Sequence, residues 1–465
     1  MKRIVVLGAG VTGLAAADRL LEIGGCEVTV VEAESVVGGL AATIVRDGIA
    51  TDLGPHRIHT ELPEVQDLLP DLIGDRLLRV QRSSRMYLGG RWISYPLQAR
   101  EVLRALGIGR VLRFGAGLAA ARIVGLFSRK PPATFEDAMK RAFGAAAYRA
   151  VFGPYARKVW RTEPSQLSAE IARVRLPEQG MSASFGRVLR GAGPVREFLY
   201  VRGGIGQLSE RLAERVKQRG GRILLDSRAT HLKPGPKGVG ALVVLQPSGT
   251  VSLDADAVIS TIPLPLLGAM LPSADPMMRA ALANLEYLSI LLIVLVANQE
   301  RISPDHWLYF PQEPPSLTRA CEPKNFDASL APADKSCLCC EITLRRDETR
   351  WEKSSDVIAG KVERELAATG LLSQGNIVSH FAIRKDWAYP IYRLGFEKTL
   401  ATVWPFLAHV PNLVTTGRQG LFNHNNMDHC LVMGRRAAEA VAANVTPARA
   451  WYDSLGQFAE FRILD

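Results

Sequence analysis

The stretch TDLGPHRIHT, residues 51–60, places two histidines three positions apart, directly after a glycine-proline pair. Imidazole side chains act as general acids or bases and as metal ligands, so His56 and His59 are open to three interpretations: catalytic groups, half of a metal site, or plain turn residues. We predict no metal, because two imidazoles without a third Asp, Glu or Cys nearby make an incomplete ligand set. The choice between the other two interpretations depends on the rest of the chain.

A second set of residues with chemical meaning stands in IVVLGAGVTGLAAADRL, near the N-terminus. Gly8, Gly10 and Gly13 have G-x-G-x-x-G spacing between an expected strand and an expected helix. In this motif the glycines permit a tight turn, close approach of a pyrophosphate and close helix-strand packing. The next expected strand, CEVTVVEAE, ends in Glu32 about 20 residues further on, where a carboxylate binds ribose hydroxyls rather than a 2'-phosphate. This order of elements predicts a dinucleotide site.

Composition narrows the class of function. The 57 Lys and Arg against 46 Asp and Glu give a net charge of +11, which favours anionic partners such as phosphates, nucleotides or an acidic membrane surface. We expect no nucleic-acid partner, because no basic run with interleaved aromatic residues and no zinc-finger spacing occurs. The six cysteines form no disulfide framework and favour the reducing cytosol. Three of them stand in SCLCCEI, which is expected to be a buried strand rather than a metal site.

The elements that must position these residues change character along the chain. Residues 2–50 have the pattern strand, glycine turn, helix, strand and glycine turn, which opens a βαβ unit. Ala, Leu and Arg with helical spacing follow from about 97 to 190, and strands and helices then return, among them the apolar run at 290–297. We predict an α/β fold in which a discontinuous Rossmann-like nucleotide domain (1–90, 203–275 and 395–450) is interleaved with a helical insertion or cap (91–202) and a substrate-binding sheet region (276–394).

A further glycine pair, Gly38-Gly39, comes six residues after Glu32. With it, the chain resembles the FAD superfamily of amine oxidases, protoporphyrinogen oxidase, phytoene desaturases and UDP-galactopyranose mutase, in which such a pair contacts the FAD diphosphate region. VRGGIGQLSERLAERV and DADAVISTIPLPLL resemble later segments of the same superfamily. The resemblance implies a glutathione-reductase-type FAD-binding domain. We expect FAD to be held non-covalently, since no Cys or His lies where it would force a covalent link.

The segment GRQGLFNHNNMDH, residues 417–429, resembles the terminal part of these proteins that lies against the flavin. The resemblance implies that Gly417 and Arg418 lie near the flavin, where Arg418 could stabilise developing negative charge, and that Asp428 approaches the ribityl chain. Alternatively, Arg418 is a surface residue and Asp428 a simple helix N-cap.

Within the superfamily, DLGPHRIHT is most similar to a UDP-galactopyranose mutase segment that passes close to the isoalloxazine. This resemblance implies that Gly54 and Pro55 turn the backbone and that His56 and His59 face flavin and substrate. For His59, a hydrogen bond to a backbone carbonyl remains the alternative.

A second mutase-like segment begins PYARKVW at residue 154, and AYPIYRLG at 388–395 is closer to bacterial protoporphyrinogen-oxidase-like proteins. A helix with a packed Trp and a solvated Lys is the alternative for the first. The candidate substrate contacts from both segments are Tyr155, Lys158, Trp160, Arg173 and Tyr389.

These resemblances favour an FAD-dependent oxidoreductase that transfers hydride between flavin N5 and a bulky apolar, polycyclic or sugar-bearing small molecule. Oxygen, a quinone or NAD(P)H would be the electron acceptor or donor. Two alternatives stay open: a mutase-like, flavin-dependent isomerase of a nucleotide sugar, and a non-catalytic scaffold stabilised by FAD.

Residues 100–132 are amphipathic, with arginines spaced along an apolar segment. Such a segment can lie on an anionic membrane surface or can pack on the core as a cap helix whose arginines reach solvent. No apolar run approaches the roughly 20 residues that span a bilayer. We therefore expect a cytoplasmic protein, with peripheral membrane contact through 100–132 as an open question.

Overall fold

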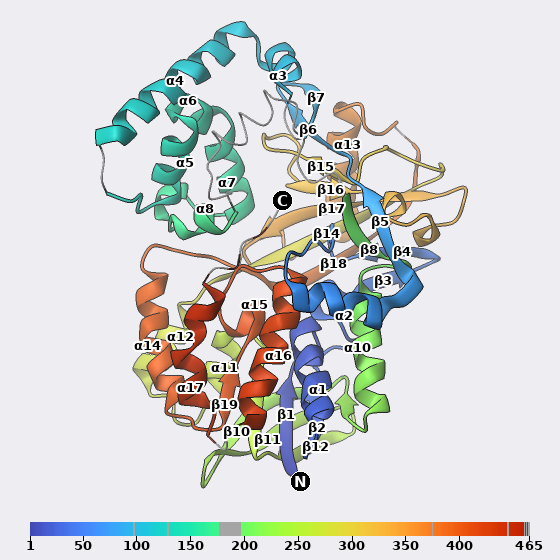
Figure 1. Ribbon diagram of the computed structural model, residues 1–465. Coiled ribbons are helices and arrows are strands. Elements are labelled where there is room, and N and C mark those ends of the chain that lie inside the picture. Colours follow the sequence, from blue (N-terminus) through green and yellow to red (C-terminus); the bar gives the residue numbers. More distant parts are fainter. Residues whose placement is uncertain are drawn as a thin grey trace.

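The computed structural model describes residues 1–95, 98–127, 130–175, 197–373, 375–443 and 446–459, with Phe461 and Ile463. Figure 1 shows an α/β half below, a second sheet above it on one side and a group of helices above it on the other. Residues 176–196 of the predicted helical insertion lie outside the described residues.

A five-stranded sheet carries the dinucleotide motif, and all of its neighbouring strands run parallel. Its buried strands are short and β-branched, as expected where helices cover a parallel sheet. Helix α1 (Val11–Ile23) packs against both α10 (Gly206–Gln218) and α16 (Met427–Ala443). The predicted α/β class is therefore confirmed. In spatial order the strands are β19 (Leu413–Thr415), β13 (Ala257–Ser260), β1 (Lys2–Leu7), β2 (Cys26–Val31) and β9 (Arg222–Leu224).

The second large sheet has seven strands and mixed direction. The apolar run 290–297 and the cysteine cluster form two of its central strands, and the cysteine-bearing strand is buried along its whole length. Helix α13 (Ser355–Ala368) packs on the sheet. The strands are β18 (Ile377–Pro390), β14 (Tyr287–Ala297), β17 (Ser336–Leu344), β16 (Arg319–Cys321), β15 (Trp307–Tyr309), β6 (Ser84–Leu88) and β7 (Arg91–Ser94).

The position of β6 and β7 corrects one expected boundary. The domain limit predicted at residue 90 falls between these two strands, which pair with each other. Strand β6 also pairs with β15, so the N-terminal part of the chain contributes to both large sheets. The sequence could not reveal this, because the partner strand lies more than 200 residues away.

The helices at the upper left of Figure 1 belong to the predicted insertion. Within the part of the chain that the structure describes, none of the helices combines the length and the apolarity needed to cross a membrane. The helices are α3 (Ala99–Leu106), α4 (Ile108–Phe127), α5 (Phe135–Phe143), α6 (Ala145–Ala147), α7 (Gly153–Trp160) and α8 (Glu170–Arg175).

Shorter elements complete the described chain. The small sheets are β3 (Thr43–Arg46) with β4 (Ile49–Asp52), β5 (Leu77–Gln81) with β8 (Glu197–Val201), and β10 (Arg228–Gly235) with β11 (Gly238–Gln246) and β12 (Gly249–Asp254). The remaining helices are α2 (Pro63–Ile73), α11 (Leu264–Met270), α12 (Pro276–Ala283), α14 (Phe396–Ala408), α15 (Gly417–Gly420) and α17 (Ala448–Asp453).

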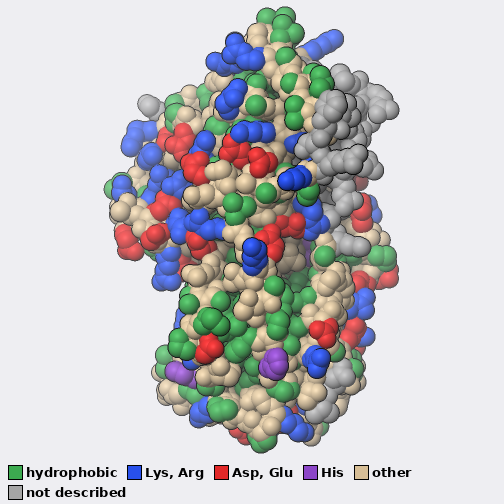
Figure 2. Space-filling view, turned by 90° about the vertical axis from the view of Figure 1, so that its left-hand side faces the viewer, with side chains coloured by type: hydrophobic (Ala, Val, Ile, Leu, Met, Phe, Trp, Pro, Cys, Tyr) green, Lys and Arg blue, Asp and Glu red, His purple; other side chains and the backbone are tan. Residues whose placement is uncertain are grey.

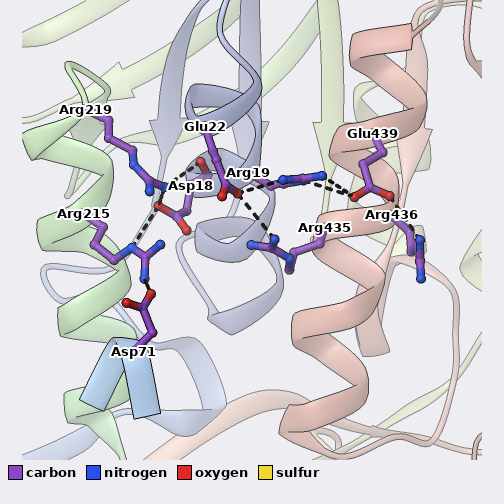
Figure 3. A network of polar contacts seen from close by, with 9 residues as sticks. All are labelled: Asp18, Arg19, Glu22, Asp71, Arg215, Arg219, Arg435, Arg436 and Glu439. Atoms are coloured by element: carbon purple, nitrogen blue, oxygen red, sulfur yellow. Dashed lines mark hydrogen bonds and ion pairs between the residues drawn. The ribbon is translucent and has the colours of Figure 1, made fainter. Parts of the chain in front are cut away.

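A polar network joins α1 to the helices on either side of it (Figure 3). Asp18 of α1 is buried; it pairs with Arg215 of α10 and accepts from Arg219, which directly follows the last residue of α10. On the other side, Arg19 pairs with Glu439 of α16 at 3.0 Å. Because a buried carboxylate without partners is costly, this network favours one arrangement of the three helices.

Backbone contact at Gly434 brings α16 directly against α1. A Cβ atom added at Gly434 would lie 2.2 Å from the carbonyl oxygen of Thr12. No real side chain fits at that distance, so glycine at this position sets the separation of the two helices.

We expect Gly434→Ala to lower the free energy of unfolding by about 1–3 kcal/mol, because overpacking must push the helices apart. Gly360→Ala in α13 is the matched control, since its Cβ would meet only a flexible Arg364 side chain at 3.5 Å. Alanine there should be neutral or stabilising by up to about 1 kcal/mol. Chemical denaturation followed by circular dichroism measures both changes, and equal effects of the two substitutions would contradict the close helix contact.

Candidate functional site

The turn between β1 and α1 has the backbone shape that its glycines predict. Gly8 has φ +98°, and a Cβ added there would lie 2.4 Å from Oγ1 of Thr261. A Cβ at Gly13 would lie 1.9 Å from the carbonyl oxygen of Gly8, so this glycine is needed for packing and does not line a cavity. Gly8, Gly10 and the first turn of α1 line a large cavity. A helix N-terminus with free N–H groups favours a phosphate there.

The second glycine pair lies directly beside the first turn. The N–H of Gly38 donates to the carbonyl oxygen of Ala9 at 2.8 Å, and Gly38 forms a bridge with Gly10. Gly38 and Gly39 both have positive φ, at 111° and 56°, and both line the cavity. The two loops therefore form one continuous wall made mostly of backbone.

Glu32 stands at the end of β2, on the rim of this wall. Its carboxylate accepts from the N–H of Ala9 at 2.7 Å and from the N–H of Glu34 at 3.0 Å. These bonds fix its orientation, and Glu32 lines the cavity. A carboxylate held in this way fits the ribose hydroxyls of a dinucleotide.

The loop that follows β4 carries the two histidines. Asp52 anchors its start by accepting from Tyr200 Oη at 2.6 Å, Thr43 Oγ1 at 2.6 Å and the Ile205 N–H at 3.1 Å. Gly54 has φ +102°, and a Cβ there would lie 3.1 Å from Oε2 of Glu341. The turn therefore requires glycine, although Gly54 itself is not among the residues that line the cavity.

Pro55, His56 and His59 line the cavity. Burial, with the positive charges of Arg418 and Arg319, lowers the pKa of His56 to about 3. Its Nδ1 is buried and has no hydrogen-bond partner among the described residues. His56 is therefore a neutral imidazole at physiological pH, with one nitrogen left to meet a bound molecule. Burial also lowers the pKa of His59, and the charge of Arg57 adds to this effect.

Arg418 enters the cavity from the short helix α15. Its guanidinium donates to the carbonyl oxygen of Asn425 at 2.5 Å and lies 5.5 Å from the ring centre of Tyr389. Both Arg418 and Tyr389 line the cavity. Gly417 and Asp428 do not: a Cβ at Gly417 would meet Thr12, and Asp428 is buried in the first turn of α16.

The helical insertion provides an apolar wall opposite the glycine loops. Tyr155 and Trp160, two of the candidate substrate contacts, belong to it. The other apolar residues of this wall are Phe135, Met139, Val151, Phe152, Ala156, Val159, Ile171 and Ala172.

The structure does not bring Lys158 and Arg173 to the cavity lining. Lys158 is buried and donates to the carbonyl oxygens of Phe310, Gln312 and Pro315 at 2.5–2.9 Å, and burial lowers its pKa to about 8. Arg173 pairs with Glu170 in the turn before it. Lys158 therefore binds backbone carbonyl oxygens near residue 312, and Arg173 stabilises its own helix.

Three arginines that the sequence interpretation missed face the same cavity. Arg57 and Arg82 each lie 5.6 Å from the ring centre of Trp307. Arg319 donates to Glu341 at 2.7 Å and to Tyr389 Oη at 3.0 Å, joining β16, β17 and β18. A single carboxylate in the otherwise uncharged strand SCLCCEITL was the one local signal that could have pointed to this group.

These walls enclose one cavity of about 630 Å³ that extends from the glycine loops to the helical insertion. Its two glycine loops, the oriented Glu32 and the unpartnered Nδ1 of His56 fit a dinucleotide such as FAD at one end. The described residues hold no group of three His, Cys, Asp or Glu side chains that could bind a metal ion.

Comparison with known proteins agrees with this geometry. The family model of flavin containing amine oxidoreductases matches residues 11–442. Protoporphyrinogen oxidase 2 of Arabidopsis thaliana is 45% identical over 71 residues, which are 15% of this chain and 14% of that protein. The 4,4'-diapophytoene desaturase of Staphylococcus aureus (strain COL) is 34% identical over 93 residues, 20% of this chain and 16% of that protein. These two matches therefore span only a small part of either relative.

Solved structures resemble the whole chain at low identity. A reduced UDP-galactopyranose mutase has a TM-score of 0.83 and 22% identity, with 100% of both chains covered. A putative protoporphyrinogen oxidase from Exiguobacterium sp. 255-15 has a TM-score of 0.75 and 20% identity, covering 95% of this chain and 99% of that one. Putrescine oxidase bound to putrescine has a TM-score of 0.64 and 18% identity, with 95% and 99% covered. At such identities the likeness concerns the fold alone.

We expect Glu32→Ala to weaken FAD binding at least about tenfold, because a ligand hydrogen bond to a charged group contributes roughly 1.5–3 kcal/mol. Quenching of flavin fluorescence during titration of the flavin-free protein measures the dissociation constant. Glu27→Ala, an exposed residue of β2, is the matched control and should leave the dissociation constant unchanged. Unaltered binding by the Glu32 variant would remove Glu32 from the cofactor site.

The imidazole of His56 should remain neutral from pH 5 to pH 8, because its pKa lies at about 3. Long-range ¹H–¹⁵N NMR spectra over this range would follow the ring nitrogens, with His56→Gln identifying the signal. A midpoint near the ordinary histidine value, about 6.5, would contradict the buried, arginine-flanked position.

Proposed function

Because the chain belongs to the flavin-containing amine oxidoreductases, we propose that it is an FAD-dependent oxidoreductase acting on a bulky, largely apolar small molecule. The cofactor is FAD, held without a covalent bond. When bound, FAD supplies hydride transfer at its N5 atom.

One observation carries this proposal: the cavity is continuous from Glu32 to the apolar wall of the helical insertion. A dinucleotide occupying the glycine-loop end leaves Phe135, Tyr155 and Trp160 to contact a second molecule. Apolar and aromatic side chains bind a bulky hydrocarbon or ring system and exclude water from the reacting atoms.

The polar residues of the cavity have three roles in this proposal. The guanidinium of Arg418, which lies over the Tyr389 ring, stabilises negative charge on a molecule bound at that end of the cavity. Neutral His56 accepts or donates one hydrogen bond through its unpartnered nitrogen. Arg319 is held by Glu341, which keeps its planar donor group directed along the cavity wall.

A second candidate function is a flavin-dependent isomerase of a nucleotide sugar. It is favoured by Arg57 and Arg82, since arginines beside aromatic rings suit a diphosphate joined to a base, and by Arg319, which lines the same cavity. An isomerase of this kind requires reduced flavin but consumes no net electrons.

Anaerobic titration of the purified protein distinguishes the two functions. For the oxidoreductase, we expect the visible flavin bands to bleach when a polycyclic or isoprenoid candidate is added alone. Bleaching by NADPH only, followed by interconversion of a nucleotide sugar without net redox turnover, would establish the isomerase instead. Absence of flavin after reconstitution would refute both.

For the substrate that bleaches the flavin, Tyr155→Ala should lower kcat/KM about tenfold. The substitution removes apolar contact that contributes roughly 1.5 kcal/mol to transition-state binding. Tyr87→Ala is the matched control, because Tyr87 is also half-buried but does not line the cavity. Stopped-flow reduction measures both variants. Equal losses would place the substrate elsewhere.

A further inference from the structure

Helix α4 exposes an apolar surface that its own packing does not explain. The helix packs against α5 and α6, and Val111, Phe114 and Leu118 form its half-buried side. With 100° per residue, a second apolar row lies on the opposite side, where its large members are 59–67% exposed. We name this row the α4 stripe: Ile108, Leu112, Ala116, Ala119 and Ile123.

Arginines flank the α4 stripe on both of its edges. At the same helical spacing, Arg113 lies on one edge and Arg122 on the other, and both are exposed. Arg104 and Arg110 are exposed nearby. The sequence has no Asp or Glu between residues 102 and 135, so no acidic neighbour along the chain neutralises this charge.

The exposed apolar side chains are concentrated here. Of the fifteen large hydrophobic side chains that are exposed among the described residues, five lie between residues 103 and 124. Figure 2 shows hydrophobic and basic side chains intermixed at the upper end of the molecule. An apolar patch rimmed by charge marks an interaction surface, whereas single exposed hydrophobic residues do not.

We propose that α4 docks on an anionic phospholipid bilayer. The α4 stripe enters the boundary between headgroups and acyl chains, while the flanking arginines extend to the lipid phosphates. The helix lies in the plane of the surface and does not cross it. A second copy of the chain is a poor occupant, because symmetric contact would bring two arginine rims together.

The location of α4 gives this docking a consequence for the cavity. Helix α5 lies directly against α4 and contributes Phe135 and Met139 to the apolar cavity wall. Docking would therefore hold that wall on the bilayer side of the protein. The proposal rests on the surface of α4 and stands independently of the reaction.

Flotation of the flavin-loaded full chain with lipid vesicles tests the proposal. The vesicles contain phosphatidylcholine alone or equal parts of phosphatidylcholine and phosphatidylglycerol. We expect binding to the mixed vesicles only, decreasing as salt screens the charges. Arg113→Gln/Arg122→Gln should lower the partition coefficient by roughly 30-fold, since each arginine contributes roughly fivefold.

The apolar contribution is tested by Ile108→Ser/Leu112→Ser/Ile123→Ser, which should lower partitioning at least about tenfold. The matched control is Met277→Ser/Val357→Ser/Val378→Ser, whose side chains are 54–74% exposed on other elements. Flavin content and Tm should be unchanged in every variant.

Three results would overturn the proposal. These are no binding of the unaltered protein to phosphatidylglycerol vesicles, an equal loss in the control triple variant, and a stripe variant that alters only the oligomeric state in sedimentation. The last result would identify the α4 stripe as a contact between copies.

Discussion

Close backbone packing around the first turn of α1 is the constraint on which the rest of this structure depends. A Cβ at Gly13, Gly417 or Gly434 would lie 1.9–2.7 Å from atoms of Gly8 or Thr12. The loop before α1, the helix α15 and the helix α16 therefore all lie in contact with the first turn of α1. Because that turn also offers its N–H groups to the cavity, the same close packing shapes the wall of the proposed cofactor site.

Charge in the cavity is arranged so that cations surround a neutral histidine. Arg418 and Arg319 both disfavour protonation of His56, and burial does so more strongly. The arginine charges are themselves balanced locally, as where Glu341 accepts from Arg319. The cavity thus combines permanent positive charge with an uncharged hydrogen-bonding group, an arrangement suited to a cofactor or substrate that carries negative charge.

The helical insertion faces two environments. Its inner helices give the cavity an apolar wall, and its outer helix α4 gives the surface an apolar stripe between arginines. The same composition of Ala, Leu and Arg serves both sides, because helical periodicity separates the inward and outward rows. This division explains why one amphipathic segment supports both a core interpretation and a membrane interpretation in the sequence.

The sequence alone determined the features that depend on local backbone geometry: the α/β class, both glycine loops, the acid at the end of β2, and the turn that presents His56. Each of these features follows from residue spacing and backbone conformation within a short stretch of chain. Only the tertiary structure decided that Arg319 and Glu341 join the cavity wall and that Lys158 does not. Strand pairing places the first two there, and backbone carbonyls near residue 312 bind the third. Such contacts join residues far apart in the chain, so a local pattern can mark a residue as unusual but cannot identify its partner.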